Sequence, residues 1–131
     1  MLLDHINTLE ELESECLLHE QVINLTCSEQ PEEALQHGND LTVIIARTGK
    51  MMADAQYHRD NAISNAIEKT VENGMSDRLS ASALTKYVNS CTSTENFIYT
   101  WIERIHRTAE KQLDWTRTII SYAKEEMRLS R

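Results

Sequence analysis

The sequence has few of the residues that interrupt regular structure. Its 131 residues include one proline and three glycines, well below the usual shares of about 5% and 7%. Because strand-rich folds need many turns, and these residues supply turns, the composition excludes such a fold and favours helices. Aromatic residues are also scarce, with two tryptophans, four tyrosines and one phenylalanine. We therefore expect a single domain whose core is built from Leu, Ile, Val, Met and Ala.

Long apolar runs are absent as well. None approaches the ~20 residues that a membrane-spanning helix needs. The first residues, MLLDHINTLEELE, contain acids and no Lys or Arg, which does not fit a secretory signal. The three cysteines, Cys16, Cys27 and Cys91, are odd in number and widely spaced, so we expect small buried side chains in a reducing compartment. These features predict a cytoplasmic protein with no membrane partner.

Positive charge is missing from the first third of the chain. Residues 1–46 contain ten carboxylates and no Lys or Arg, residues 47–99 contain six acids and six bases, and residues 100–131 contain seven bases and five acids. The net charge is −8. Segregated charge is informative about partners and self-association, not about fold. The simplest interpretation is that the acidic segment lies near the basic one, in the same or a neighbouring subunit.

Apolar residues recur at spacings of three and four, which is typical of amphipathic helices. We expect an acidic helix at about 8–27 that begins with a capping box of Thr8 and Glu11. A long helix follows at about 31–73 and begins at Pro31, although Gly38 in QHGND offers a break. A short helix at about 82–91 and a second long helix at about 93–128 complete the chain. The pattern predicts an all-α helical bundle of one domain, residues 1–131, with two long antiparallel helices as its spine.

Two helices of this length leave apolar surface uncovered in a chain of this size, so we expect a homo-oligomer. The residues predicted for the oligomer core share the apolar stripes of the long helices. They are Ile45, Met52, Ala55, Ile63, Ile67, Ile98, Ile102, Ile105, Leu113 and Ile120.

Several short motifs resemble phosphate-binding or metal-binding motifs but lack residues that such sites need. The run LTVIIARTGKMM ends like a phosphate-binding loop, but Ile44 stands where such a loop needs glycine and Met51 where it needs Ser or Thr. Glu103-x-x-His106 has the spacing of a di-iron ligand pair, and Cys16-x-x-His19 that of half a zinc site, but neither has a second pair. We therefore expect no catalytic residues, no cofactor and no metal, and a protein that is not an enzyme.

Charged helix faces remain as candidate binding surfaces. An acidic face could contact a basic surface of another protein or imitate a phosphate backbone; its residues are Glu10, Glu11, Glu13, Glu15, Glu20, Glu32 and Glu33. The last helix carries basic stripes, beside Trp115 and Tyr122, that could follow a nucleic-acid backbone; they contain Arg104, Arg107, Lys111, Arg117, Lys124 and Arg128. Because acids interleave with these bases, a solvated face is the simpler interpretation of that helix.

Two stretches, ARTGKMMADAQYHRDNA and STENFIYTWIERIHRTAEKQLDWTRTIISYAKEEM, resemble short helical proteins of bacteriophages and prophages of Bacteroidales. The resemblance rests on Gly49-Lys50, Asp54, Tyr57, Trp101, Gln112 and Arg117-Thr118, and it brings no established activity. It implies a small accessory protein in an infected bacterial cytoplasm that serves phage DNA metabolism, assembly or evasion of host defences. We expect a non-enzymatic adaptor or inhibitor. The alternatives are an accessory nucleic-acid-binding protein and a structural virion component.

Overall fold

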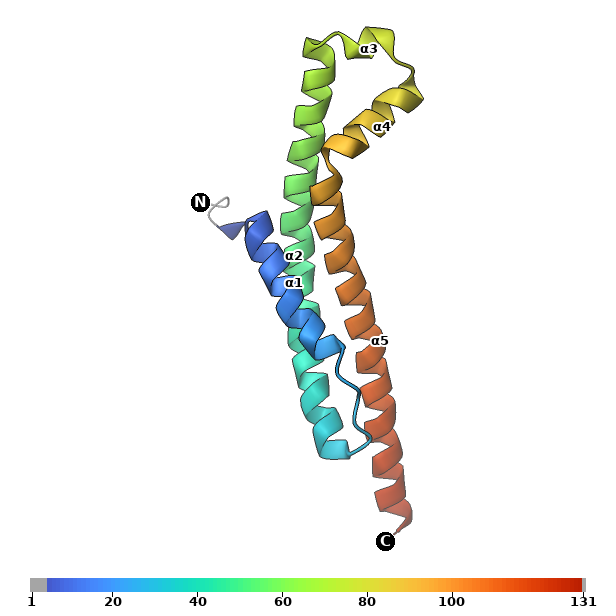
Figure 1. The fold of residues 1–131 in the computed structure, drawn as a ribbon. Helices are drawn as coiled ribbons and strands as arrows, with labels where there is room; N and C mark the ends of the chain where they lie inside the picture. Colours follow the sequence, from blue (N-terminus) through green and yellow to red (C-terminus); the bar gives the residue numbers. More distant parts are fainter. Residues whose placement is uncertain (1–4, 131) are drawn as a thin grey trace.

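The computed structural model describes residues 5–130, and this part of the chain is all-helical without a strand. The helices are α1 (Leu9–Ile23), α2 (Pro31–Glu72), α3 (Met75–Arg78), α4 (Ala81–Cys91) and α5 (Ser93–Leu129). α2 and α5 run antiparallel and side by side, α1 lies obliquely across them, and α3 and α4 connect the long helices at one end (Figure 1). Among these helices, none combines the length and apolarity required to cross a bilayer.

The hydrophobic core fills the seam between α2 and α5. Leu41 and Met51 of α2 and Ile102 of α5 are fully buried, and α1 adds Leu12 and Cys16. The stripes that the sequence shows are therefore the inner faces of the helix pair, as the 3.6-residue period requires.

This packing corrects part of the prediction for self-association. Ala55, Ile98, Ile102 and Ile105 were expected in an oligomer core, but each is at most 4% exposed within the single chain. Since their surfaces are already covered, they have nothing to offer a second copy. Ile45, Met52, Ile63, Leu113 and Ile120 are half-buried, and Ile67 is 50% exposed.

α2 continues through Gly38 without a break. The helix persists because Gly38 is buried against α5, where an added Cβ would lie 3.3 Å from Thr116 Oγ1. Glycine costs about 1 kcal/mol in a helix interior relative to alanine, and here it allows the two long helices to approach closely. The QHGND segment is thus a packing site, and α2 has 42 residues.

α1 is shorter than expected. The predicted capping box is present, with the Glu11 amide donating to Thr8 Oγ1 and the Thr8 amide to Glu11 Oε1. The helix ends at Ile23, however, and not near Cys27. The apolar face stops there, and residues 24–30 carry the chain to Pro31 at the start of α2.

The connection between the long helices also differs from the prediction. α3 was not expected, and α4 begins at Ala81 with Ser80 as its N-cap. Cys91, expected to face inward, is exposed. Thr92 occupies the N-cap position of α5 without a side-chain cap hydrogen bond, and its hydroxyl donates to the Val88 carbonyl of α4 at 2.9 Å.

Candidate functional site

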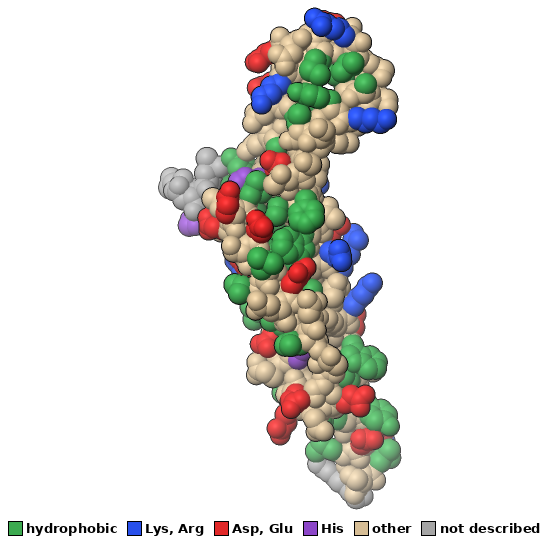
Figure 2. All heavy atoms as spheres, viewed as in Figure 1, with side chains coloured by type: hydrophobic (Ala, Val, Ile, Leu, Met, Phe, Trp, Pro, Cys, Tyr) green, Lys and Arg blue, Asp and Glu red, His purple; other side chains and the backbone are tan. Residues whose placement is uncertain are grey.

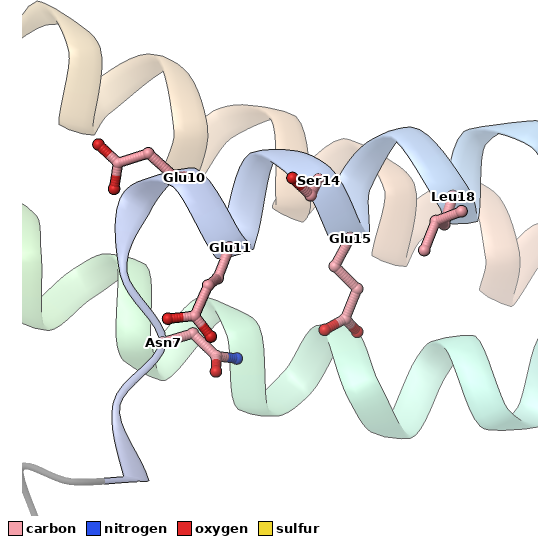
Figure 3. Close-up of a pocket in the computed structure, with 6 residues that line it drawn as sticks. All are labelled: Asn7, Glu10, Glu11, Ser14, Glu15 and Leu18. Carbon is pink, nitrogen blue, oxygen red and sulfur yellow. The ribbon is translucent and has the colours of Figure 1, made fainter.

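The outer face of α1 carries a shallow groove of about 430 Å³. Its lining comes from the start and outer side of this one helix: Asn7, Glu10, Glu11, Ser14, Glu15 and Leu18. In Figure 3 the Glu11 side chain lies beside Asn7, Glu15 points toward α2, and Glu10 points away from it. Leu17 and Leu18 are 52% and 61% exposed on the same helix. The groove therefore combines carboxylates with unburied leucine, and we call it the α1 groove.

The entry to α1 is clamped to α2 by a buried carboxylate. Asp54 is 3% exposed, and it accepts hydrogen bonds from the Asn7 amide at 3.0 Å and from Lys50 Nζ at 2.5 and 2.7 Å. Lys50 also donates to the His5 carbonyl at 2.8 Å, and His58 Nε2 lies 2.7 Å from the Asn7 carbonyl. Because a buried carboxylate is stable only when its oxygens are paired, this cluster fixes the position at which α1 begins.

A second contact ties the middle of α1 to α2. Arg47 forms a two-pronged ion pair with Glu15, with Nε 2.9 Å from Oε2 and Nη2 2.7 Å from Oε1. His19 Nε2 lies 2.8 Å from the same carboxylate. The hydrogen bond from Arg47 lowers the pKa of Glu15 below its ordinary value, against the opposing effect of partial burial. Glu15 therefore stays ionised at neutral pH and at mildly acidic pH.

Two more contacts fasten α1 to α5. Trp101 Nε1 donates to Glu20 Oε1 at 2.5 Å. Gln112 Nε2 donates to the carbonyl of Ile23, the last residue of α1, at 2.6 Å. The Gln112 bond satisfies a carbonyl that has no partner inside the helix. α1 is thus held at its start, middle and end, so its outer face has one fixed orientation.

The seven acidic residues predicted as one face lie in different environments. Glu15 and Glu20 are engaged in contacts within the chain, and Glu11 serves the capping box. Glu10 and Glu13 are exposed on α1. Glu32 and Glu33 are exposed at the start of α2, on the far side of the linker 24–30. The structure therefore divides the predicted acidic face into two separate surfaces.

The six predicted basic residues are all exposed on α5. Three form ion pairs with acids of the same helix: Arg107 with Glu103 at 3.3 Å, Arg117 with Asp114 at 3.4 Å, and Arg128 with Glu125 at 2.5 Å. The acidic α1 packs beside α5, as the simplest interpretation of the charge distribution expected. Within residues 5–130, however, the ion pair that α1 forms with another helix is with Arg47 of α2 and not with a base of α5.

The candidate metal ligands are occupied in other ways. His106 Nδ1 lies 2.8 Å from Thr48 Oγ1, and His106 Nε2 lies 3.0 Å from Glu110. Within residues 5–130 no three His, Cys, Asp or Glu side chains gather as ligands for a metal ion. Cys16 is fully buried, and its burial raises the pKa of the thiol to about 12. Such a thiol stays protonated and is a poor nucleophile.

Sequence reasoning missed the role of the residues that hold α1 in place, although Lys50, Asp54 and Trp101 are among those on which the resemblance rests. Arg47, Lys50, Asp54 and Trp101 belong to other helices, and nothing in the spacing of α1 indicates them. One local signal was available, because Lys50 and Asp54 stand four residues apart on α2, where an ion pair is expected.

Comparison with known proteins gives no assignment. No known protein family matches the chain, and no curated protein or solved structure is significantly similar to it.

Proposed function

We propose that this chain is a non-enzymatic adaptor or inhibitor that binds a basic surface of another protein through the outer face of α1. We also propose, from the sequence resemblance, that it is a small phage-type accessory protein that acts in a bacterial cytoplasm. In this role α2 and α5 act as a rigid support, and α1 presents the binding surface.

One observation carries the proposal: the α1 groove is exposed, yet the helix beneath it is fixed by contacts at its start, middle and end. A fixed helix loses little conformational entropy when it binds. Two exposed carboxylates of α1, Glu10 in the groove and Glu13 outside it, favour a partner with Lys or Arg. Leu18 in the groove and the exposed Leu17 supply the apolar contact that charge alone does not give.

The geometry supports a protein partner better than nucleic acid. A phosphate backbone is bound by uncompensated positive charge. On α5, three of the six predicted bases already pair with neighbouring acids, and the whole chain has a net charge of −8. We therefore keep the acidic face of α1 as the proposed binding surface and advance no nucleic-acid role.

The test is capture of bacterial proteins on immobilised chain, with two matched charge variants. Glu10→Lys/Glu13→Lys reverses charge on the α1 face, and Glu68→Lys/Glu72→Lys makes the same change at the exposed far end of α2. We expect the first variant to lose a specifically captured protein at least tenfold and the second to retain it. Equal capture by both variants and the wild type would contradict the proposal.

A further inference from the structure

α5 carries a second heptad stripe that does not face α2. The residues alternate at spacings of four and three along the whole helix: Phe97, Trp101, Arg104, Thr108, Lys111, Trp115, Thr118, Tyr122, Glu125 and Leu129. The stripe that packs on α2 contains Ile98, Ile102, Ile105, Ala109 and Thr116, all of them buried. A strict repeat of 3.5 residues is the pattern that a helix uses to pair with another helix. We call these ten residues the α5 stripe.

Four of the five large apolar members of the α5 stripe are strongly exposed, and the fifth, Trp101, is half-buried beside α1. Phe97 is 65%, Trp115 53%, Tyr122 68% and Leu129 71% accessible to solvent. Grooves lie beside the stripe at two places, one of about 270 Å³ next to Phe97 and Trp101 and one of about 470 Å³ next to Trp115 and Tyr122. In Figure 2 hydrophobic side chains emerge along the lower part of α5, with acidic side chains among them. Exposed aromatic residues in this number are unusual for a surface that meets only water.

The chain exposes more surface than a compact protein of the same mass. The chain exposes 9116 Å², whereas a compact monomer of 15.1 kDa exposes about 7,100 Å². The excess of about 2,000 Å² is more than the roughly 800 Å² that each partner buries in a stable interface. The elongated helix pair therefore leaves more surface uncovered than a dimer needs to cover.

We infer that a second copy of this chain pairs with the α5 stripe in antiparallel orientation. Antiparallel pairing over the full stripe places Phe97 opposite Leu129 of the other copy. It also sets Arg104 against Tyr122 and Lys111 against Trp115, and a cation over an aromatic ring is attractive in both positions. A two-fold axis repeats each pair, so the stripe is complementary to itself.

A parallel arrangement lacks this match. Two parallel α5 helices would place Arg104, Lys111 and Glu125 each beside the same residue of the other copy. Like charges would then meet at three layers. The antiparallel order joins the basic middle of the stripe to the aromatic and acidic end instead. This assignment specifies the surface of the proposed self-association and does not depend on the partner of α1.

The first experiment measures the mass of the chain in solution by light scattering. We expect twice 15.1 kDa for the wild type, and a twofold lower mass for Trp115→Lys, which sets Lys against Lys111 in both halves of the dimer. Trp115→Glu faces the same lysine with an opposite charge and should keep the doubled mass. Val43→Lys, at a similarly exposed α2 position outside the stripe, should keep it too. A monomeric wild type, or Lys and Glu variants of equal mass, would overturn the inference.

A cysteine pair tests the register independently. Thr108→Cys/Thr118→Cys, in a Cys91→Ser background, brings the two new thiols face to face across the dimer, whereas within one helix they are about 15 Å apart and cannot join. Oxidation should then give a covalent dimer from the double variant and none from either single variant. Absence of that dimer would overturn the register. Both measurements are separate from protein capture by α1, so failure of either proposal is distinguishable from failure of the other.

Discussion

Arg47 on α2 holds Glu15 on α1 with two hydrogen bonds, of 2.9 and 2.7 Å, across 32 residues of sequence. A planar guanidinium matched to a carboxylate fixes direction as well as distance. The pair therefore sets the rotation of α1 about its axis, and with it the side of the helix that carries the α1 groove.

Replacing Arg47 with alanine should lower the free energy of unfolding by about 1 kcal/mol at pH 7, since Arg47 is partly exposed and solvent screens the pair. The control is Arg117→Ala, which removes the exposed pair with Asp114 and should have an effect near zero. Urea unfolding followed by circular dichroism measures both. Equal losses for the two variants would contradict the role given to Arg47.

The same pair predicts a dependence on pH. Because the pKa of Glu15 is lowered in the folded chain, the ion pair contributes fully to the free energy of unfolding at pH values above the ordinary carboxyl pKa. The contribution is lost as pH falls through the lowered value, where the folded carboxylate takes up its proton. The difference in stability between wild type and Arg47→Ala should therefore be largest near neutral pH and shrink below pH ~4. A difference that stays constant down to pH 2.5 would show that the ion pair does not stabilise the fold.

Asp54→Ala should destabilise the chain by about 2–3 kcal/mol, because it leaves the Asn7 amide and Lys50 without their buried acceptor. Asp60→Ala, at an exposed position of α2, is the matched control and should change stability by less than about 0.5 kcal/mol. Hydrogen exchange offers a local readout. The amide of Asn7 should exchange faster in Asp54→Ala and at the wild-type rate in Asp60→Ala.

Two glycines of α2 should respond in opposite ways. Gly49→Ala should raise the free energy of unfolding by about 1 kcal/mol, since nothing lies within 4 Å of the new Cβ and alanine favours the helix. Gly38→Leu should lower it by about 1–3 kcal/mol, because the side chain has to displace α5 at Thr116. Thermal unfolding of both variants beside the wild type measures this. A stabilising Gly38→Leu would mean that the helices do not approach closely there.

Thiol chemistry should separate the cysteines. Cys91 is exposed, whereas Cys16 is buried with a thiol pKa of about 12. The third cysteine, Cys27, is half-buried and is replaced with serine for this experiment. In the Cys27→Ser chain an aromatic disulfide reagent should react rapidly with Cys91 in the folded state and reach Cys16 only after denaturation, because the thiolate is the reacting form. Cys91→Ser should remove the rapid phase. If Cys16 still reacted rapidly in that variant, the packing of α1 on the core would be wrong.

Helical periodicity predicted the long helices well, because one apolar stripe on each of them is buried along the seam. The capping box at Thr8 and Glu11 was also readable, since all its atoms belong to four consecutive residues. Whether Gly38 breaks the long helix could not be decided from the sequence, because the reason for a glycine there is the approach of Thr116 from α5. Spacing describes a face of a helix and does not say which element covers it.

The candidate site was only partly predictable for the same reason. The exposed carboxylates of α1 were visible in the sequence, but the contacts that orient them join residues far apart, such as Glu20 and Trp101, separated by 81 positions. The division of the acidic set into two surfaces depends on where α1 ends. At that end the Ile23 carbonyl accepts a hydrogen bond from Gln112 of α5, a residue 89 positions away in the sequence.

The most direct test of a binding surface on α1 replaces Leu18 with a photoreactive amino acid and identifies what it crosslinks to in bacterial extract. Leu18 lies in the α1 groove, and Val71, at the far end of α2 with similar exposure (63% against 61%), is the control position. We expect one defined protein adduct from position 18, which disappears with Glu10→Lys/Glu13→Lys, and no such adduct from position 71. No adduct at position 18, or the same adduct at both positions, would contradict it.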